Sequence, residues 1–80
     1  MTKNVVGPRV RELRHRPGRE MTQEELAARL QALGVDLGRS AVAKIETGRR
    51  PVTDVEIVAL CKVLGVKVGA LFGEDEKAAT

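Results

Sequence analysis

Apolar residues recur along this chain at spacings of three and four positions, which places their side chains on one face of an α-helix. Two segments show this pattern clearly. The first predicts a helix over about 23–33, with an inward face formed by Leu26, Ala27, Leu30 and Leu33. The second predicts a helix over about 54–64, with a face formed by Ile57, Leu60, Cys61 and Leu64. We find no alternating pattern that would predict a β-strand.

Both helices begin with the same local signal. Thr22 is followed three residues later by Glu25, and Thr53 is followed in the same way by Glu56. This spacing is that of a capping box, in which each side chain satisfies a backbone N–H of the first turn. Single glycines then stand where helices are expected to end, at positions 34, 48 and 65.

Three further helices are predicted. Gly7-Pro8 starts one over about 8–15, because proline is tolerated in the first turn of a helix. Another covers about 39–47, after Gly38, which is a weak N-cap. A short one, near 68–72, contains Leu71 and Phe72.

These elements predict an all-α fold, a compact five-helix domain that occupies residues 1–80 and contains a helix-turn-helix. Within it we expect a flexible arm over residues 1–6, a folded core over 7–73 and a polar tail over 74–80. With 80 residues, the chain has room for one modest core and no separate sensing domain.

Charge is unevenly distributed along the chain. The formal net charge is +3, but residues 1–50 contain 11 Lys/Arg against 6 Asp/Glu, whereas residues 51–80 contain 3 against 5. A basic first part favours binding to a polyanion, although charged residues on an ordinary solvated surface would give the same numbers of Lys/Arg and Asp/Glu. Phe72 is the only aromatic residue, which argues against recognition of single strands by base stacking.

The helix predicted over 39–47 has one face that is suited to DNA. On a helical wheel, Val42 and Ile45 point inward. The opposite face is polar or small and consists of Ser40, Ala43, Lys44 and Thr47, with Arg39 at its edge. Donors on such a face can bond to base edges in the major groove, and the residues nearest the helix N-terminus reach deepest.

Contacts with phosphate are expected beside this helix. Gln23 lies in the first turn of the preceding helix, where free backbone N–H groups favour an anion. Arg49 and Arg50 follow directly after the 39–47 helix, and Thr47 lies on its outward face. We therefore expect these four residues to contact the DNA backbone.

Four segments together resemble the lambda-repressor/Cro-like helix-turn-helix domains. They are VGPRVRELR, MTQEELAARL, GRSAVAKIETGRR and LCKVLGVKVGALF, and they span about residues 6–73 in this order. The resemblance implies five helices, with the third in the major groove of double-stranded DNA. It implies base contacts by Arg39, Ser40, Ala41 and Lys44, and phosphate contact by Gln23.

The same resemblance implies an ion pair between Arg14 and Glu46, so that Glu46 has a structural role. Two connections are longer than in typical members of the family, namely residues 15–20 and 31–37. Extra length there would change the angle of the third helix, whose usual connecting turn has 3–4 residues.

The predicted function is that of a sequence-specific transcriptional regulator that binds DNA as a homodimer on a palindromic site. The pairing surface is expected among Val55, Val58, Val63, Val66 and Phe72, unless these residues fill the domain's own core. The alternative is an antitoxin or another helix-turn-helix module that acts through a protein partner.

The other candidate residues indicate no further chemistry. His15 has no neighbour at ligand spacing, and Ser40 and Thr22 have no base, so we expect no enzyme, no metal site and no cofactor. Cys61, the one cysteine, is expected to be a buried structural residue. Without a signal peptide or an apolar run of membrane length, the expected location is the cytoplasm, with no membrane partner.

Overall fold

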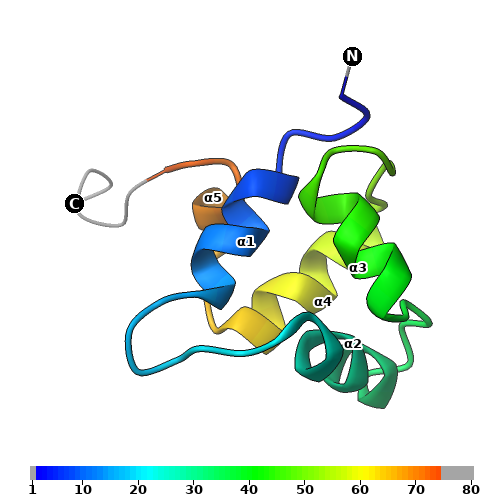
Figure 1. The fold of residues 1–80 in the computed structure, drawn as a ribbon. Coiled ribbons are helices and arrows are strands. Elements are labelled where there is room, and N and C mark those ends of the chain that lie inside the picture. The colour runs from blue at the N-terminus through cyan, green and yellow to red at the C-terminus, as the bar shows by residue number, and fades with distance from the viewer. Residues whose placement is uncertain (1, 75–80) are drawn as a thin grey trace.

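The five helices follow one another in the expected order (Figure 1). The computed structural model describes residues 2–74, and over these residues it contains helices and connections but no strand. The helices are α1 (Gly7–Arg14), α2 (Gln23–Ala32), α3 (Arg39–Glu46), α4 (Asp54–Leu64) and α5 (Val68–Leu71). The predicted all-α fold is confirmed, and each predicted helix end lies within one residue of the observed one.

Both predicted capping boxes are present. The hydroxyl of Thr22 accepts a hydrogen bond from the backbone N–H of Glu25, whose carboxylate accepts one from the Thr22 N–H, each at 3.0 Å. Thr53 and Glu56 make the same pair of bonds at the start of α4. At the other end of α4, Gly65 has φ +68°, a left-handed conformation that glycine adopts without steric cost.

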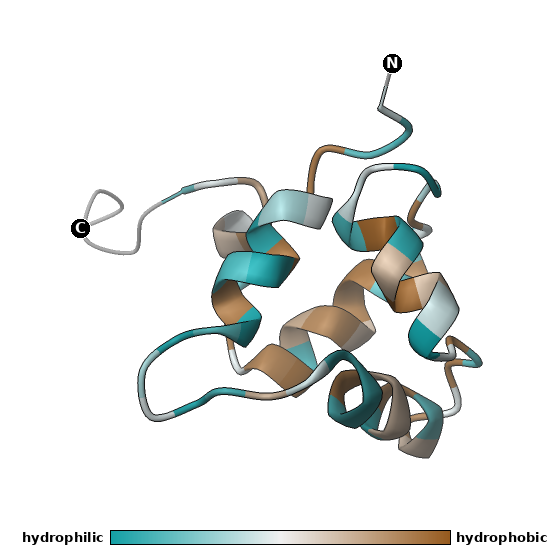
Figure 2. Ribbon diagram, in the orientation of Figure 1, coloured by the Kyte–Doolittle hydropathy of each residue, from teal (hydrophilic) through white to brown (hydrophobic). Residues whose placement is uncertain are grey.

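The core lies where the first four helices meet. α3 packs against α1 and α2, while α4 packs against α1, α2 and α5. Figure 2 shows α4 as largely hydrophobic, in contrast to the hydrophilic connection between α1 and α2. The largest fully buried side chains are Leu26, Leu30, Ile45, Leu60, Leu71, Val6, Val10 and Val42.

The segment before α1 differs from the expected flexible arm. Val6 is buried in the core, and the side chain of Asn4 donates to the carbonyls of Ile45 and Arg50. The backbone N–H of Lys3 donates to the carbonyl of Gly48 at 2.7 Å. The segment therefore packs along the end of α3 and the loop after it, because it offers donors to one carbonyl of the last helical turn and to two carbonyls of that loop. Met1 and most of the predicted tail, residues 75–80, lie outside the described residues.

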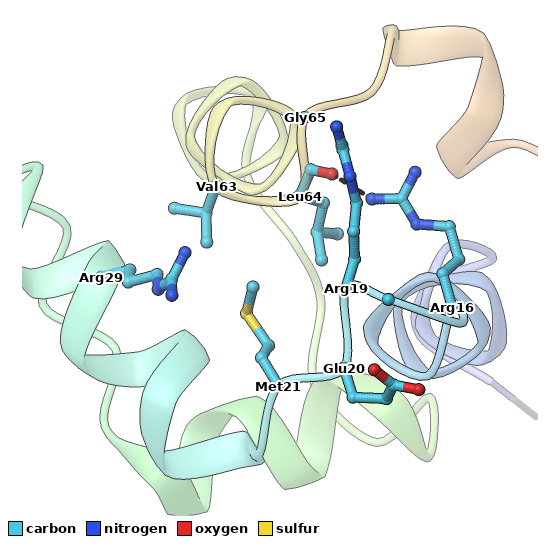
Figure 3. Close-up of a pocket in the computed structure, with 9 residues that line it drawn as sticks. Arg16, Arg19, Glu20, Met21, Arg29, Val63, Leu64 and Gly65 are labelled. Atoms are coloured by element: carbon cyan, nitrogen blue, oxygen red, sulfur yellow. Dashed lines mark hydrogen bonds between the residues drawn. The ribbon is translucent and has the colours of Figure 1, made fainter.

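The long connection between α1 and α2 is attached to α4. The guanidinium of Arg16 donates to the carbonyl of Leu64, at the end of α4, and Arg19 extends beside Gly65 (Figure 3). Positive charge at this position suits the negative end of the helix dipole. The extra residues of this connection thus stabilise the α4 C-terminus. No helix within residues 2–74 is long and apolar enough to cross a membrane.

Candidate nucleic-acid interface

The exposed side of α3 carries the residues that were predicted to contact bases. Val42 and Ile45 are each 1% exposed and fasten the helix to the core. Arg39, Ser40 and Lys44 are exposed on the opposite side, and Ala41 is half-buried between them. The alternation follows directly from the 3.6-residue helical repeat, since positions 42 and 45 share one face. This side of α3 thus offers cationic and hydroxyl donors around a small residue.

A shallow hollow joins this side of α3 to the following loop. It is lined by Gly38, Ser40, Ala41, Lys44, Arg49, Arg50 and Pro51. Three of the four predicted base-contacting residues and two of the four predicted phosphate-contacting residues therefore share one concave surface. A second hollow beside it brings the fourth base-contacting residue, Arg39, together with Gln23.

A buried ion pair holds α3 against α1. The Arg14 guanidinium donates to both Glu46 oxygens, from Nε to Oε2 at 2.7 Å and from Nη2 to Oε1 at 2.9 Å. Both side chains are less than a tenth exposed, and Arg14 also donates to the carbonyl of Met21. The hydrogen bonds that Arg14 donates to Glu46 raise the pKa of Arg14, so the charge of this guanidinium is permanent. The pair fixes the rotation of α3 about its own axis.

Gln23 extends this buried network to the surface. Its side-chain amide donates to Oε1 of Glu46 at 3.1 Å, from the first turn of α2. An amide nitrogen carries two hydrogens, so one donor is still available to an outside acceptor. Gln23 therefore connects a potential phosphate contact to the residue that orients α3.

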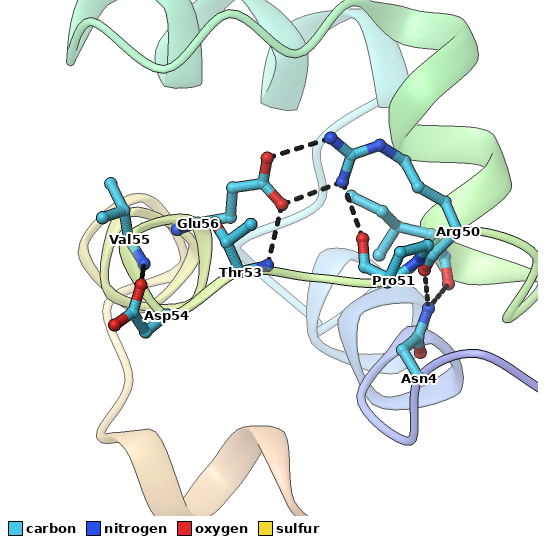
Figure 4. A network of polar contacts seen from close by, with 8 residues as sticks. Asn4, Arg50, Pro51, Thr53, Asp54, Val55 and Glu56 are labelled. Carbon is cyan, nitrogen blue, oxygen red and sulfur yellow. Dashed lines mark hydrogen bonds and ion pairs between the residues drawn. The ribbon is translucent and has the colours of Figure 1, made fainter.

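Arg50 and Thr47 are less available to phosphate than their sequence positions suggested. The Arg50 guanidinium makes two bonds to the Glu56 carboxylate, at 2.8 and 3.0 Å, and one to the carbonyl of Pro51 (Figure 4). These bonds raise the pKa of Arg50 and, with the Thr53 N–H, lower the pKa of Glu56. The Thr47 hydroxyl donates back to carbonyls of Ala43 and Lys44. The Thr47 hydroxyl is thus used inside the domain, and the Arg50 guanidinium keeps only some of its N–H groups for an outside acceptor.

Arg39 and Arg49 are differently placed. Arg39 is 3.7 Å from the carboxylate of Glu24, and both side chains are about two-thirds or more exposed, so solvent screens this contact. Arg49 is exposed and shares the hollow with Lys44 and Ser40. Among the described residues, no side-chain hydrogen bond or ion pair engages the Arg49 guanidinium.

Sequence reasoning missed two residues of this surface, Asn4 and Glu56. Asn4 accepts a hydrogen bond from the backbone N–H of Gly7 and donates to the carbonyls of Ile45, in the last turn of α3, and of Arg50, in the loop after it. The N-cap of α1 is Val6, so the bond between Gly7 and Asn4 is not a helix cap of the kind that a sequence pattern reveals. Glu56 was recognised as a capping residue but not as the partner of Arg50. Over residues 2–74 no cluster of His, Cys, Asp or Glu has the arrangement of a metal site.

Comparisons with known proteins identify the family to which the fold belongs. Residues 6–72 match the helix-turn-helix domain family. A solved structure, that of the restriction-modification controller protein C.AhdI from Aeromonas hydrophila, is similar with a TM-score of 0.70. The two sequences are 37% identical, over 84% of this chain and 87% of that chain. No curated protein matched the sequence.

Proposed function

Because this chain belongs to the helix-turn-helix domain family, in the lambda-repressor/Cro-like group that its motifs indicated, we propose that it is a sequence-specific, DNA-binding transcriptional regulator. The observation that carries the proposal is the exposed side of α3, where Ser40, Ala41 and Lys44 share a hollow with Arg49. The similar protein from A. hydrophila is a restriction-modification controller, which supports a regulatory role over an enzymatic one.

In this proposal α3 enters the major groove. Arg39 and Ser40 are the principal base readers, because they lie at the N-terminus of the helix, and Lys44 reads one turn further on. A long cationic side chain can bond to guanine O6 and N7, whereas the small side chain of Ala41 allows close approach to a thymine methyl group.

Contacts with the DNA backbone come from both sides of α3. Gln23 donates from the start of α2, and Arg49 donates from the loop after α3. We assign Thr47 and Arg50 a smaller part in phosphate binding than the sequence suggested, because their donors already bond within the domain. Their main contribution is to stabilise the conformation of the end of α3 and of the loop between α3 and α4.

The regulator is proposed to act as a dimer on a palindromic site. Of the valines and phenylalanine expected at the pairing surface, Val55, Val58 and Phe72 are 65%, 49% and 50% exposed. Val63 and Val66 pack against the core instead, so they are weaker candidates. Val55 and Val58 border an apolar hollow with Leu33 and Val35, which favours the α4 side as the contact between two copies.

Selection of bound duplexes from a random library tests the proposal. A regulator of this kind should enrich a two-fold symmetric sequence whose half-sites are separated by about one helical turn. Arg39→Ala and Lys44→Ala should change the enriched bases, while Gln23→Ala should weaken binding to all sequences. A selected pool that stays random, together with a second protein that purifies tightly with the chain, would favour action through a protein partner.

A further inference from the structure

The segment before α1 is fastened to the end of α3 by one side chain. Asn4 donates from Nδ2 to the carbonyl of Ile45 at 3.1 Å and to the carbonyl of Arg50 at 2.7 Å (Figure 4). Its Oδ1 accepts from the N–H of Gly7 at 2.8 Å. A single carboxamide thus joins the start of α1, the last turn of α3 and the loop between α3 and α4.

Backbone carbonyls before and after Arg49 both accept hydrogen bonds from the segment that precedes α1. The carbonyl on its N-terminal side, from Gly48, accepts the N–H of Lys3, and the carbonyl on its C-terminal side, from Arg50, accepts the Asn4 amide. The Arg49 N–H itself donates to the carbonyl of Lys44 at 2.9 Å. Three hydrogen bonds therefore fix the backbone at Arg49 and at the residue on each side of it.

The two neighbouring arginines have opposite roles. The guanidinium of Arg50 bonds to the carboxylate of Glu56, so its charge is paired within the domain. Arg49 is exposed and, within residues 2–74, has no side-chain partner. It lies on the same hollow as the α3 residues Ser40 and Lys44. A fixed backbone with an unengaged guanidinium is a pre-organised donor, so binding would cost less conformational entropy.

We infer that Asn4 is a positioning residue for DNA binding, which holds the 48–51 loop so that Arg49 meets a phosphate beside the groove that α3 occupies. This inference rests on the proposed function and adds to it a specific residue outside the helix-turn-helix. Asn4 does not touch DNA in this arrangement. It acts through Arg49.

The test measures the salt dependence of binding to a selected duplex. Each phosphate contact contributes about 0.9 to the magnitude of the slope of log K against log salt, so the loss of one contact per protomer, two in a dimer, lowers that magnitude by about 1.8. Arg49→Ala should show this loss, and Asn4→Ala should show most of it although no charge is removed. The double variant should then resemble Arg49→Ala alone, since Asn4 acts through that arginine.

Two controls separate positioning from general loss of stability. Leu64→Val, which trims a buried side chain in the last turn of α4, at the opposite end of that helix from the loop, should lower the unfolding temperature and leave the salt slope unchanged. Lys3→Pro, which lacks the N–H that bonds to Gly48, is compared with Lys3→Ala, which keeps it. The slope of log K against log salt should be smaller in magnitude for Lys3→Pro than for Lys3→Ala. This comparison of the two Lys3 variants remains informative if Asn4→Ala does not fold.

The outcomes are distinguishable from those of the proposed function. If the unaltered chain selects no duplex, the DNA-binding proposal itself fails. If it binds and the slope is the same with Asn4→Ala as without it, or if the Asn4 and Arg49 losses add in full, the positioning role is overturned.

Discussion

At the scale of single residues, a close backbone contact explains why position 7 accepts only glycine. Gly7, the first residue of α1, is buried against the carbonyl of Ile45, and a Cβ built there would overlap that oxygen. Its backbone conformation is an ordinary helical one, so the requirement is for space alone. The first turn of α1 can approach α3 only because this residue has no side chain.

Gly7→Ala is therefore expected to destabilise the domain by about 1–3 kcal/mol, the usual cost of overpacking a core. Urea denaturation followed by circular dichroism measures the loss. Gly38→Ala is the matched control, since a Cβ at Gly38 meets no atom within 4 Å. Equal stabilities of the two variants would show that α1 can shift away from α3 without cost.

The Arg14–Glu46 pair gives a second prediction at this scale. Glu46→Gln leaves the buried Arg14 charge without its counter-ion, which typically costs about 3–5 kcal/mol. The free energy of unfolding should fall by that order in a denaturant titration. The double variant Arg14→Met with Glu46→Leu should recover part of the loss, because neither charge remains in the core. No recovery would mean that the bonds to Met21 and Gln23 outweigh the charge itself.

At the scale of elements, the loop between α3 and α4 depends on one carboxylate. Glu56 caps the first turn of α4 through Thr53 and binds the Arg50 guanidinium at the same time. The bonds from Arg50, followed by those from Thr53, hold the pKa of Glu56 below its ordinary value of 4.5. The loop geometry is thus linked to protonation of this side chain.

The linkage predicts how stability changes with pH. Because the folded-state pKa of Glu56 is lowered, its contribution is complete above about pH 5 and is lost as pH falls through the lowered pKa. Thermal unfolding between pH 3 and pH 6 should show this decline. Glu25, whose pKa is also lowered by its bonds to Thr22, contributes to the same window. The difference in unfolding temperature between the unaltered chain and Glu56→Gln, followed across this pH range, isolates the contribution of Glu56 to stability. Identical pH profiles of the two proteins would show that Glu56 makes no such contribution.

Local patterns predicted the elements well because their causes are local. Thr22 with Glu25 and Thr53 with Glu56 set two helix starts, and the spacing of Val42 and Ile45 identified the buried face of α3. The bonds from Asn4 could not be predicted in this way, since its acceptors lie 41 and 46 residues away. The bonds from Arg50 to Glu56 could not be predicted for a related reason. Charge and position alone do not reveal whether a guanidinium already has a carboxylate partner.

At the scale of the whole molecule, apolar side chains remain on the surface over α4. Val55, Val58 and Leu33 are between 49% and 65% exposed around one hollow, on a domain of 80 residues. Contact between two copies would cover this surface. The arrangement fits the proposed two-fold symmetry of the DNA site.

Val58→Glu is expected to weaken self-association by roughly 100-fold, since an uncompensated charge at a buried contact costs about 3 kcal/mol. Sedimentation equilibrium measures the change. Val5→Glu, at a position that is 73% exposed and outside this hollow, is the control. If both variants associate like the unaltered chain, the hollow over α4 is not the pairing surface.

The one cysteine of the chain offers a way to observe these equilibria without any substitution. Cys61 lies on the buried face of α4, and burial raises the pKa of its thiol, so the reactive thiolate is scarce in the closed domain. A maleimide or disulfide reagent reaches the sulfur only when α4 separates from the core. The labelling rate therefore counts opening events. A duplex that binds the closed form should slow labelling in proportion to its occupancy, which makes this thiol an internal reporter of ligand affinity.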